Sequence, residues 1–223
     1  MRILIFGGTG SLGGEIAKSA TSKGHDVIIA TRNLAESKSH IRLTSNLTLE
    51  ISENTKFDAV IWSQGKNIND AAGTSESLDE LWKANIGYIH ETFKDLLSRN
   101  LLATPARLVI IGSIWQKLAR KNKFSYVVTK SAVVGIVNSL TADYADLGIT
   151  VNAVLPGVVD TPMTRSNLNN NQIKKIISGT PVGRLVSTSE VASVVTWLCS
   201  AESSGIVGQC IEVDNGWSNF REI

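Results

Sequence analysis

Short β-rich runs alternate with helical ones along the 223 residues, and this alternation limits the folds available to the chain. The predicted strands are residues 2–6, 26–31, 47–51, 58–63, 107–113, 150–156 and 209–214. Helical spacing of apolar residues falls between them, at 12–23, 78–99, 126–147 and 190–201. Ser77 and Ser187 each precede an acidic residue by three positions, which is a helix start signal. Strands separated by helices predict an α/β fold with a doubly wound, mostly parallel seven-stranded sheet.

The composition favours one globular domain and gives no sign of a polyanionic partner. Hydrophobic residues make up 43% of the chain, and 22 basic against 20 acidic residues give a formal charge of +2 without long blocks of one sign. No segment reaches the ~18 apolar residues of a membrane helix, and the apolar run at 2–6 is too short for a signal peptide. We therefore expect a soluble, cytoplasmic protein that binds neither nucleic acid nor membrane.

The cysteines and histidines form no recognisable metal or redox motif. Cys199 and Cys210 lack metal-type spacing, and free thiols are expected rather than a disulfide. His25, His40 and His90 are dispersed along the chain, so no catalytic metal is predicted.

Three glycines at a spacing of three, Gly7, Gly10 and Gly13, follow the first predicted strand. Glycine permits a tight turn and a close backbone approach, and the N–H groups at the start of a helix suit a pyrophosphate. Strand, loop and helix in this order predict a Rossmann-type dinucleotide site. With no repeat or Pro/Gly linker to divide the chain, residues 1–223 are expected to form a single dinucleotide-binding and catalytic domain.

Tyr126 and Lys130 lie four positions apart at the start of a predicted helix and therefore share one face of it. In that arrangement the Lys130 ammonium group is expected to lower the pKa of the Tyr126 phenol toward neutral pH. Ser113 ends the preceding predicted strand, and Asn85 lies in the helix before that strand. A tyrosine with a lowered pKa can serve as a general acid or base.

Together with the glycine loop, "VNAVLPGVVDTPM" at 151–163 and the segment 181–218, these residues resemble the short-chain dehydrogenase/reductase family across essentially the whole chain. The sequence is most similar to the small ketoreductase-like branch. The resemblance implies an oxidoreductase that transfers a hydride between a nicotinamide cofactor and a ketone, an aldehyde or an alcohol.

The resemblance also implies roles for four residues. Tyr126 would exchange the proton with the substrate oxygen, and Ser113 would hydrogen-bond that oxygen. Lys130 would hold the nicotinamide ribose as well, and Asn85 would support a water relay to solvent.

Further positions would contact the cofactor. Gly65 would approach the adenosine half, and Val159 and Thr161 would lie beside the nicotinamide amide. The positions that the resemblance assigns to the pyrophosphate are Gly7, Thr9, Gly10, Ser11 and Leu12.

The sequence departs from the family pattern at three places. Ser11 stands where many relatives have glycine, so the contacts to phosphate are expected to shift. "WSQG" at 62–65 replaces Asn-Asn-Ala-Gly, which removes the usual asparagine hydrogen bonds. Few residues separate the predicted strands 47–51 and 58–63, so the helix that normally joins the third and fourth strands is expected to be missing.

The end of the second predicted strand bears on the choice of cofactor. A carboxylate here would bind the ribose 2′-hydroxyl of NAD(H), but the chain has Thr31 and Arg32. An arginine can neutralise and fork onto the 2′-phosphate of NADP(H), so NADP(H) is predicted to be preferred, with NAD(H) possible. The alternative is an exposed arginine without a ligand and an inward-turned Glu36.

Other functions known for this fold fit these residues less well. A non-catalytic dinucleotide-sensing protein of the same fold tends to lose the tyrosine and lysine, and this chain keeps both. Enoyl reductases of this fold separate the two residues more widely, so the spacing of Tyr126 and Lys130 favours carbonyl reduction.

The substrate side of the site gives only open alternatives. Trp115 either lines the pocket or packs against the sheet edge. Segment 117–123 has four basic residues, which either meet an acyl carrier protein or a substrate carboxylate or form a solvated loop. Asn167–Asn171 is either a flexible surface loop or part of a mobile lid at 163–178.

The predicted helices 78–99 and 126–147 carry more apolar surface than one sheet contact needs. We expect a homo-oligomer, a tetramer or a dimer, with these helices in one interface and residues 213–220 near another. The apolar positions on the second helix are Val133, Val134, Ile136, Val137 and Leu140.

Overall fold

The computed structural model describes residues 1–32 and 39–219, and its centre is one seven-stranded sheet with the order β3-β2-β1-β4-β5-β6-β7. Each pair of neighbouring strands in this sheet is parallel, which confirms the predicted α/β class. The strands are β1 Arg2–Phe6, β2 Asp26–Thr31, β3 His40–Arg42, β4 Phe57–Trp62, β5 Leu102–Ile111, β6 Ile149–Pro156 and β7 Cys210–Val213.

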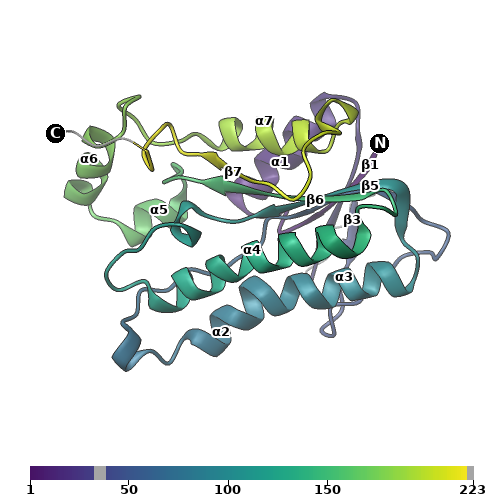
Figure 1. The fold of residues 1–223 in the computed structure, drawn as a ribbon, viewed down its shortest axis with the longest axis horizontal. Helices are drawn as coiled ribbons and strands as arrows, with labels where there is room; N and C mark the ends of the chain where they lie inside the picture. Colours follow the sequence, from purple (N-terminus) through teal and green to yellow (C-terminus); the bar gives the residue numbers. More distant parts are fainter. Residues whose placement is uncertain (33–38, 220–223) are drawn as a thin grey trace.

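Helices cover both faces of the sheet, as expected for a doubly wound fold (Figure 1). Helices α1 and α7 pack together on one face, and α2, α3 and α4 lie on the other. The main helices are α1 Ser11–Ser22, α2 Leu78–Trp82, α3 Tyr88–Ser98, α4 Phe124–Tyr144 and α7 Thr188–Leu198. The shorter ones are η1 Ala72–Thr74, the π-helical η2 Lys83–Gly87, η3 Ile114–Gln116, α5 Pro162–Asn167, α6 Asn170–Ser178 and η4 Ala201–Ser203.

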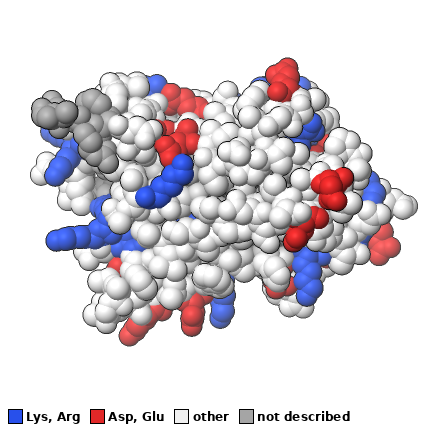
Figure 2. Space-filling model, viewed as in Figure 1, with Lys and Arg blue, Asp and Glu red and all other residues white. Residues whose placement is uncertain are grey.

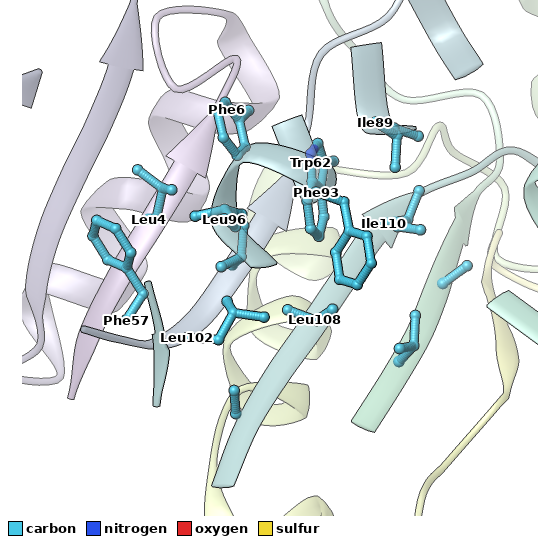
Figure 3. Packing of buried hydrophobic residues seen from close by; sticks show 14 of the residues in the cluster. Leu4, Phe6, Phe57, Trp62, Ile89, Phe93, Leu96, Leu102, Leu108 and Ile110 are labelled. Atoms are coloured by element: carbon cyan, nitrogen blue, oxygen red, sulfur yellow. The ribbon is translucent and has the colours of Figure 1, made fainter. Parts of the chain in front are cut away.

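The alternation of side chains along a strand divides the core into two layers. In β1, Leu4 and Phe6 join the cluster on the α3 and α4 side, whereas Ile3 and Ile5 join the cluster on the α1 and α7 side. Figure 3 shows Phe6 beside Trp62 of β4, and the two rings stack with centroids 5.7 Å apart. A central strand that is apolar on both faces is what a parallel sheet covered on both sides requires.

The third strand was predicted in the wrong place. The structure has β3 at His40–Arg42, and the predicted strand 47–51 contributes only an isolated antiparallel bridge between Leu49 and Leu43. Leu47 has a φ of 60°, in the left-handed region, so this segment turns back on itself. Leu43 and Leu49 are buried, and their apolar character reflects packing on the core. No helix occurs within residues 43–56, so the predicted loss of the linking helix is confirmed.

The segment Asn167–Asn171, expected to be either a flexible surface loop or part of a mobile lid, is largely helical. Helix α5 ends at Asn167, and α6 begins at Asn170. The Asn169 side chain accepts the backbone N–H of Gln172 at 3.0 Å, and the Gln172 side chain accepts the Asn169 N–H at 3.0 Å. This reciprocal capping box explains the asparagine-rich sequence without a flexible loop.

The strand order reverses at β1, which has β2 on one side and β4 on the other. In a doubly wound sheet, the loops that leave the carboxyl ends of the strands at such a point enclose a crevice. The loops after β1, β4, β5 and β6 therefore define where a ligand site is expected.

Candidate active site

The loop from β1 to α1 needs glycine at two positions. Gly7 has a φ of +78°, and a Cβ there would lie 2.6 Å from the backbone nitrogen of Gln64. A Cβ on Gly13 would lie 2.2 Å from the carbonyl oxygen of Gly7. Glycine therefore lets the loop fold closely against the end of β4 and lets α1 start close to β1.

The N-terminus of α1 is suited to an anion. Gly10 is its N-cap residue, no side chain caps the helix, and its first turn has no acidic residue. The residues of this turn line a cavity, where backbone N–H groups and the positive end of the helix dipole favour negative charge. Such an end can bind a pyrophosphate.

Ser113 and Tyr126 meet where β5 ends and α4 begins. Ser113 is buried at the N-cap of η3, and its hydroxyl accepts the backbone N–H of Trp115 at 3.3 Å. Burial raises the pKa of the Tyr126 phenol, and a hydrogen bond with Ser113 opposes this rise. The pKa therefore shifts upward, opposite to the sequence-based expectation, because removing the phenolate from water destabilises it more than the neighbouring groups stabilise it. Tyr126 is therefore protonated at neutral pH.

Lys130 lies one helical turn after Tyr126, as its spacing predicted. Its Nζ is 5.9 Å from the centroid of the Tyr126 ring and donates to the carbonyl oxygen of Ile111 at 2.9 Å. The side chain is buried, and this burial lowers the pKa of Lys130 to about 8. Because a pKa of 8 lies above 7, the ammonium form still predominates at neutral pH.

Asn85 lies in the π-helical segment η2 and holds the loop after β4. Its Oδ1 accepts the backbone N–H of Lys66 at 2.8 Å, and its Nδ2 donates to the Lys66 carbonyl oxygen at 3.1 Å and to Thr129 Oγ1 at 3.0 Å. A Cβ on Gly65 would lie 3.3 Å from Asn85 Oδ1 and 3.6 Å from Lys130 Nζ. Asn85 thus sits directly behind Gly65, and π-helical turns often mark functional sites.

One cavity of about 440 Å³ joins most of the predicted residues, although their loops are far apart in sequence. Asn85 does not line it and acts from behind Gly65, whereas Thr31 and Arg32 lie outside its lining. The predicted residues that line the cavity are Gly7, Thr9, Gly10, Ser11, Leu12, Gly65, Ser113, Tyr126, Lys130, Val159 and Thr161.

Val159 and Thr161 belong to the segment that follows β6. Val159 forms an isolated parallel bridge with Val186, and its carbonyl oxygen accepts the Thr164 hydroxyl at 2.6 Å. Thr161 caps α5 by accepting the Thr164 N–H at 3.2 Å. These contacts fix the wall of the cavity at the point where the chain enters α5.

Arg32 lies at the carboxyl end of β2, beside the glycine loop. Phe6, the last residue of β1, is paired with Ala30 of β2. Thr31 and Arg32 follow Ala30 just as the glycine loop follows Phe6, so the two segments leave the sheet at the same level. The exposed Arg32 guanidinium lies 6.0 Å from the centroid of the Tyr88 ring. The competing acid, Glu36, lies outside the described residues.

Several residues of the cavity were not predicted as site residues. Gln64 and Ser63 line its floor, and the side-chain polar atoms of both are buried without a hydrogen-bond partner. Lys123 and Arg120 also line the cavity. The basic character of segment 117–123 is evident from its residues, but no pattern in the sequence indicates that Lys123 is buried.

Trp115 lines the cavity and also a second one of about 590 Å³. The second cavity shares Trp115, Arg120 and Val158 with the first and is bounded by α6. On its far side the Trp217 ring meets Trp115 edge to face, with centroids 5.6 Å apart. Trp115 also packs against the core, so the structure shows it in both of the expected settings.

The remaining expectations concern thiols, metals and membranes. Cys199 and Cys210 are both free. Within residues 1–32 and 39–219, no group of three or more His, Cys, Asp or Glu side chains is arranged to hold a metal ion. None of the helices in these residues is long and apolar enough to span a bilayer.

Comparison with known proteins identifies the family of the chain. The family model described as enoyl-(acyl carrier protein) reductase matches residues 55–218. A 3-oxoacyl-(acyl-carrier-protein) reductase of Rickettsia felis is 30% identical over 96% of this chain and 95% of its own length. The same reductase of Salmonella typhimurium is 28% identical over the same shares of both chains.

A solved structure has the same fold. The gluconate 5-dehydrogenase of Burkholderia cenocepacia superposes with a TM-score of 0.86 at 21% identity, over 99% of this chain and 96% of that one. The chain belongs to the short-chain dehydrogenase/reductase family. It is an oxidoreductase of the class that interconverts alcohols and carbonyl compounds.

Proposed function

We propose that the protein is an NADP(H)-dependent oxidoreductase that interconverts a ketone or aldehyde and an alcohol, with Tyr126 as the general acid or base. The main support for this proposal is that Ser113, Tyr126 and Lys130 line the same cavity as the glycine loop. The 3-oxoacyl reductases among its relatives act on carbonyl groups by name, which favours carbonyl over C=C reduction.

The cavity fits a dinucleotide. The first turn of α1 offers N–H groups to a pyrophosphate, and the unpartnered polar atoms of Ser63 and Gln64 would gain hydrogen bonds from a ligand that fills the cleft. We expect Lys130 to contact the nicotinamide ribose, Gly65 the adenosine half, and Val159 and Thr161 the nicotinamide amide. Once bound, NADPH supplies the hydride that reduces the carbonyl carbon.

The proton comes from the protein. Tyr126 is protonated at neutral pH because burial raises its pKa, so it can donate to the carbonyl oxygen during reduction. Ser113 is already hydrogen-bonded to Tyr126 and would hold the same oxygen. The neighbouring Lys130 ammonium stabilises the phenolate that remains.

Two observations favour NADP(H) over NAD(H). Arg32 follows β2 beside the glycine loop, where its charge can meet a 2′-phosphate. The Burkholderia cenocepacia structure is a complex with NADP, and a polyketide ketoreductase of the same fold is described with NADPH.

The first test is a panel of ketones, aldehydes and alcohols assayed with NADPH or NADP⁺ in the wild type and in Tyr126→Phe. We expect Tyr126→Phe to keep NADPH binding, followed by cofactor fluorescence, and to lose at least about 100-fold in kcat, since general acid catalysis contributes roughly 10²–10⁴-fold. Tyr144→Phe is the matched control, because Tyr144 lies at the other end of α4, packed edge to face on Phe93. A Tyr126→Phe variant with wild-type kcat would exclude the assignment.

A further inference from the structure

A second lysine faces the catalytic tyrosine. Lys123 immediately precedes α4, the residue is 3% exposed, and it lines the same cavity as Tyr126 and Ser113. Its Nζ lies 5.5 Å from the centroid of the Tyr126 ring, slightly closer than Lys130 Nζ. The ammonium group therefore lies beside the place where a substrate carbonyl must bind.

Lys123 has no carboxylate partner within ion-pair distance among the described residues. Its Nζ donates to a neutral acceptor, Asn67 Oδ1, at 2.5 Å. The nearby Asp70 carboxylate accepts from the Ser75 hydroxyl at 2.5 Å and from the Ser125 N–H at 3.0 Å, and it also accepts from the Ser125 hydroxyl. Asp70 is thus engaged with Ser75 and Ser125 and only weakly offsets the charge of Lys123.

A second cation adds to the positive charge. Arg120 lines the cavity beside Lys123. Burial and then the positive charge of Arg120 lower the pKa of Lys123, and Asp70 partly opposes them, so that the pKa lies at about 8. Two neighbouring cations, one of them buried against a neutral amide, are costly unless an anion joins them. Lys66 also lines the cavity, but it is paired with Glu80.

We propose that the substrate carries an anionic group, and that Lys123 and Arg120 bind this group while Tyr126 and Ser113 engage the carbonyl oxygen. The inference rests on the proposed carbonyl–alcohol function and adds the substrate class to it. Because Lys123 and Tyr126 adjoin, the anion lies close to the reacting carbon. The substrate class is a 2- or 3-oxo acid, or the corresponding hydroxy acid.

The reaction on such a substrate is balanced. The hydride adds to the carbonyl carbon, the C=O π bond breaks, and the oxygen takes the proton of Tyr126. The oxo acid is reduced to a hydroxy acid as NADPH is oxidised to NADP⁺, and the carboxylate stays bound to Lys123 without changing. Lys123 is therefore a residue for specificity and orientation, and the proton donor is still Tyr126.

A purely structural role for Lys123 makes a different prediction. The hydrogen bond from Lys123 to Asn67 ties the loop after β4 to the start of α4. If this tie were the only role, its loss would impair charged and neutral substrates alike. A carboxylate ligand predicts instead that only the charged substrates suffer.

The test compares matched acids and esters with NADPH: pyruvate with methyl pyruvate, and acetoacetate with methyl acetoacetate. In Lys123→Met and Lys123→Gln, kcat/KM for the acids should fall by about 10- to 100-fold, as expected for one charge-assisted hydrogen bond, with the esters within about threefold. Lys123→Gln keeps a donor for Asn67, so it separates folding from charge. Lys121→Gln, at an exposed lysine of the same loop, is the control and should change neither class.

A binding readout does not depend on turnover. Malonate and oxalate are titrated into the wild type with NADP⁺, following the fluorescence of the tryptophans, of which Trp115 lines the cavity. We expect millimolar or tighter binding of at least one dianion that weakens by 10-fold or more in Lys123→Met. Equal binding to the two proteins, or no binding to the wild type at 50 mM (roughly 1.8 kcal/mol of standard binding free energy), would overturn the inference.

The two proposals can fail separately. If malonate binding depends on Lys123 but Tyr126→Phe turns over like the wild type, the proposed mechanism is wrong and the anion site stands. If turnover depends on Tyr126 but Lys123→Met lowers kcat/KM equally for acids and esters, the anion site is wrong and the mechanism stands.

Discussion

Arg32 is a single exposed side chain whose charge is expected to select the cofactor. An arginine that forks onto the 2′-phosphate makes charge-assisted hydrogen bonds of about 1.5–3 kcal/mol, which is roughly 10- to 100-fold in affinity. We expect Arg32→Ala to lose this amount for NADPH and almost nothing for NADH, measured by cofactor fluorescence titration.

The control for Arg32 is Arg42→Ala, an exposed arginine at the end of the neighbouring strand β3 that lies near Glu50. It should leave the affinities for both cofactors unchanged. Equal affinities of the wild type for NADPH and NADH, or an unchanged NADPH affinity in Arg32→Ala, would contradict the role of Arg32.

The identity of several candidate site residues could be predicted from the sequence, but the burial and pKa of their side chains could not. The i, i+4 spacing placed Tyr126 and Lys130 on one face of a helix, and the structure agrees. The pKa of Tyr126 shifts in the direction opposite to that expected, because the depth of burial is set by the whole fold. Lys123 looked like part of a solvated loop, and its burial depends on Asn67, which is 56 positions away.

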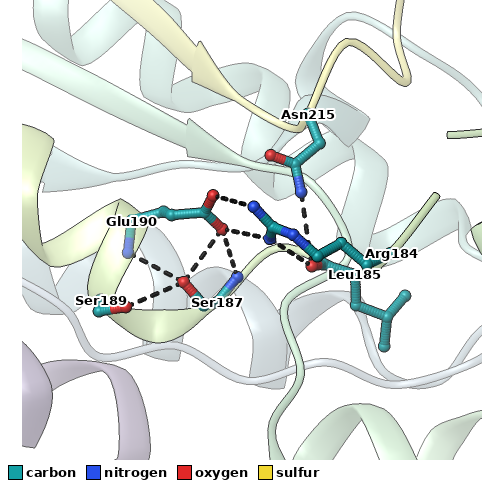
Figure 4. A network of polar contacts seen from close by, with 6 residues as sticks. All are labelled: Arg184, Leu185, Ser187, Ser189, Glu190 and Asn215. Carbon is teal, nitrogen blue, oxygen red and sulfur yellow. Dashed lines mark hydrogen bonds and ion pairs between the residues drawn. The ribbon is translucent and has the colours of Figure 1, made fainter. Parts of the chain in front are cut away.

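At the scale of elements, the start of α7 is fixed by a compact polar network, shown in Figure 4. Glu190 accepts from Arg184 through both carboxylate oxygens, at 2.7 and 2.9 Å. It also accepts the Ser187 backbone N–H at 2.8 Å, and the Ser187 hydroxyl accepts the Glu190 N–H at 3.2 Å. The Arg184 hydrogen bond and then those of Ser187 lower the pKa of Glu190 to about 2.

This network should give α7 a stability that depends on pH. A carboxylate with a lowered folded-state pKa stabilises the fold above its usual value of 4.5, and the effect is lost as the pH falls from there toward about 2. The pair is partly exposed, so we expect Glu190→Gln to cost only about 0.5–1 kcal/mol at pH 7. Urea unfolding should show this difference shrinking below pH 4.

The comparison variant for Glu190 is Glu202→Gln, which changes an exposed carboxylate in η4. It should leave the pH dependence of the free energy of unfolding unchanged. A difference between wild type and Glu190→Gln that stays constant from pH 7 to pH 3 would show that the capping network does not titrate.

Elements with a strong local pattern could be predicted, and those shaped by long-range packing could not. The capping box at Ser187 was predicted and occurs. Ser77 has the same residue pattern, but its side chain makes no capping hydrogen bond. The strand predicted at 47–51 failed because a left-handed Leu47 lets the chain turn and bury Leu49. The π-helical turn at Asn85 has no sequence signature, because it depends on the loop that Asn85 holds.

At the scale of the whole molecule, the parallel sheet brings distant segments to one edge. The cavity takes residues from the loops after β1, β4, β5 and β6, which spacing along the sequence alone does not join. Charged side chains of both signs are interspersed on the face shown in Figure 2, in keeping with the formal charge of +2. We therefore attribute the attraction of an anionic substrate to the charges in the cavity near Lys123, and not to the net charge of the chain.

Oligomer formation is the remaining prediction at this scale. Val133 and Val137, which lie four positions apart on α4 and so share one face of the helix, are fully buried against the sheet. These two of the five apolar positions predicted for the interface therefore cannot contact a second copy of the chain. The outer surface of α2, α3 and α4 still exposes Trp82 by 46%, Leu97 by 37% and Phe124 by 37%. Association with a second copy of the chain would remove exposed apolar side chains such as these from water.

Light scattering at micromolar concentration should therefore give the mass of a dimer or a tetramer for the wild type. Trp82→Glu should lower that mass, because a carboxylate buried in an interface without a partner is strongly disfavoured. Leu147→Glu is the matched control: Leu147 is 56% exposed, lies beyond the end of α4 and should leave the mass unchanged. A monomer mass for the wild type would rule out the oligomer, and an unchanged mass in Trp82→Glu would move the interface away from α2.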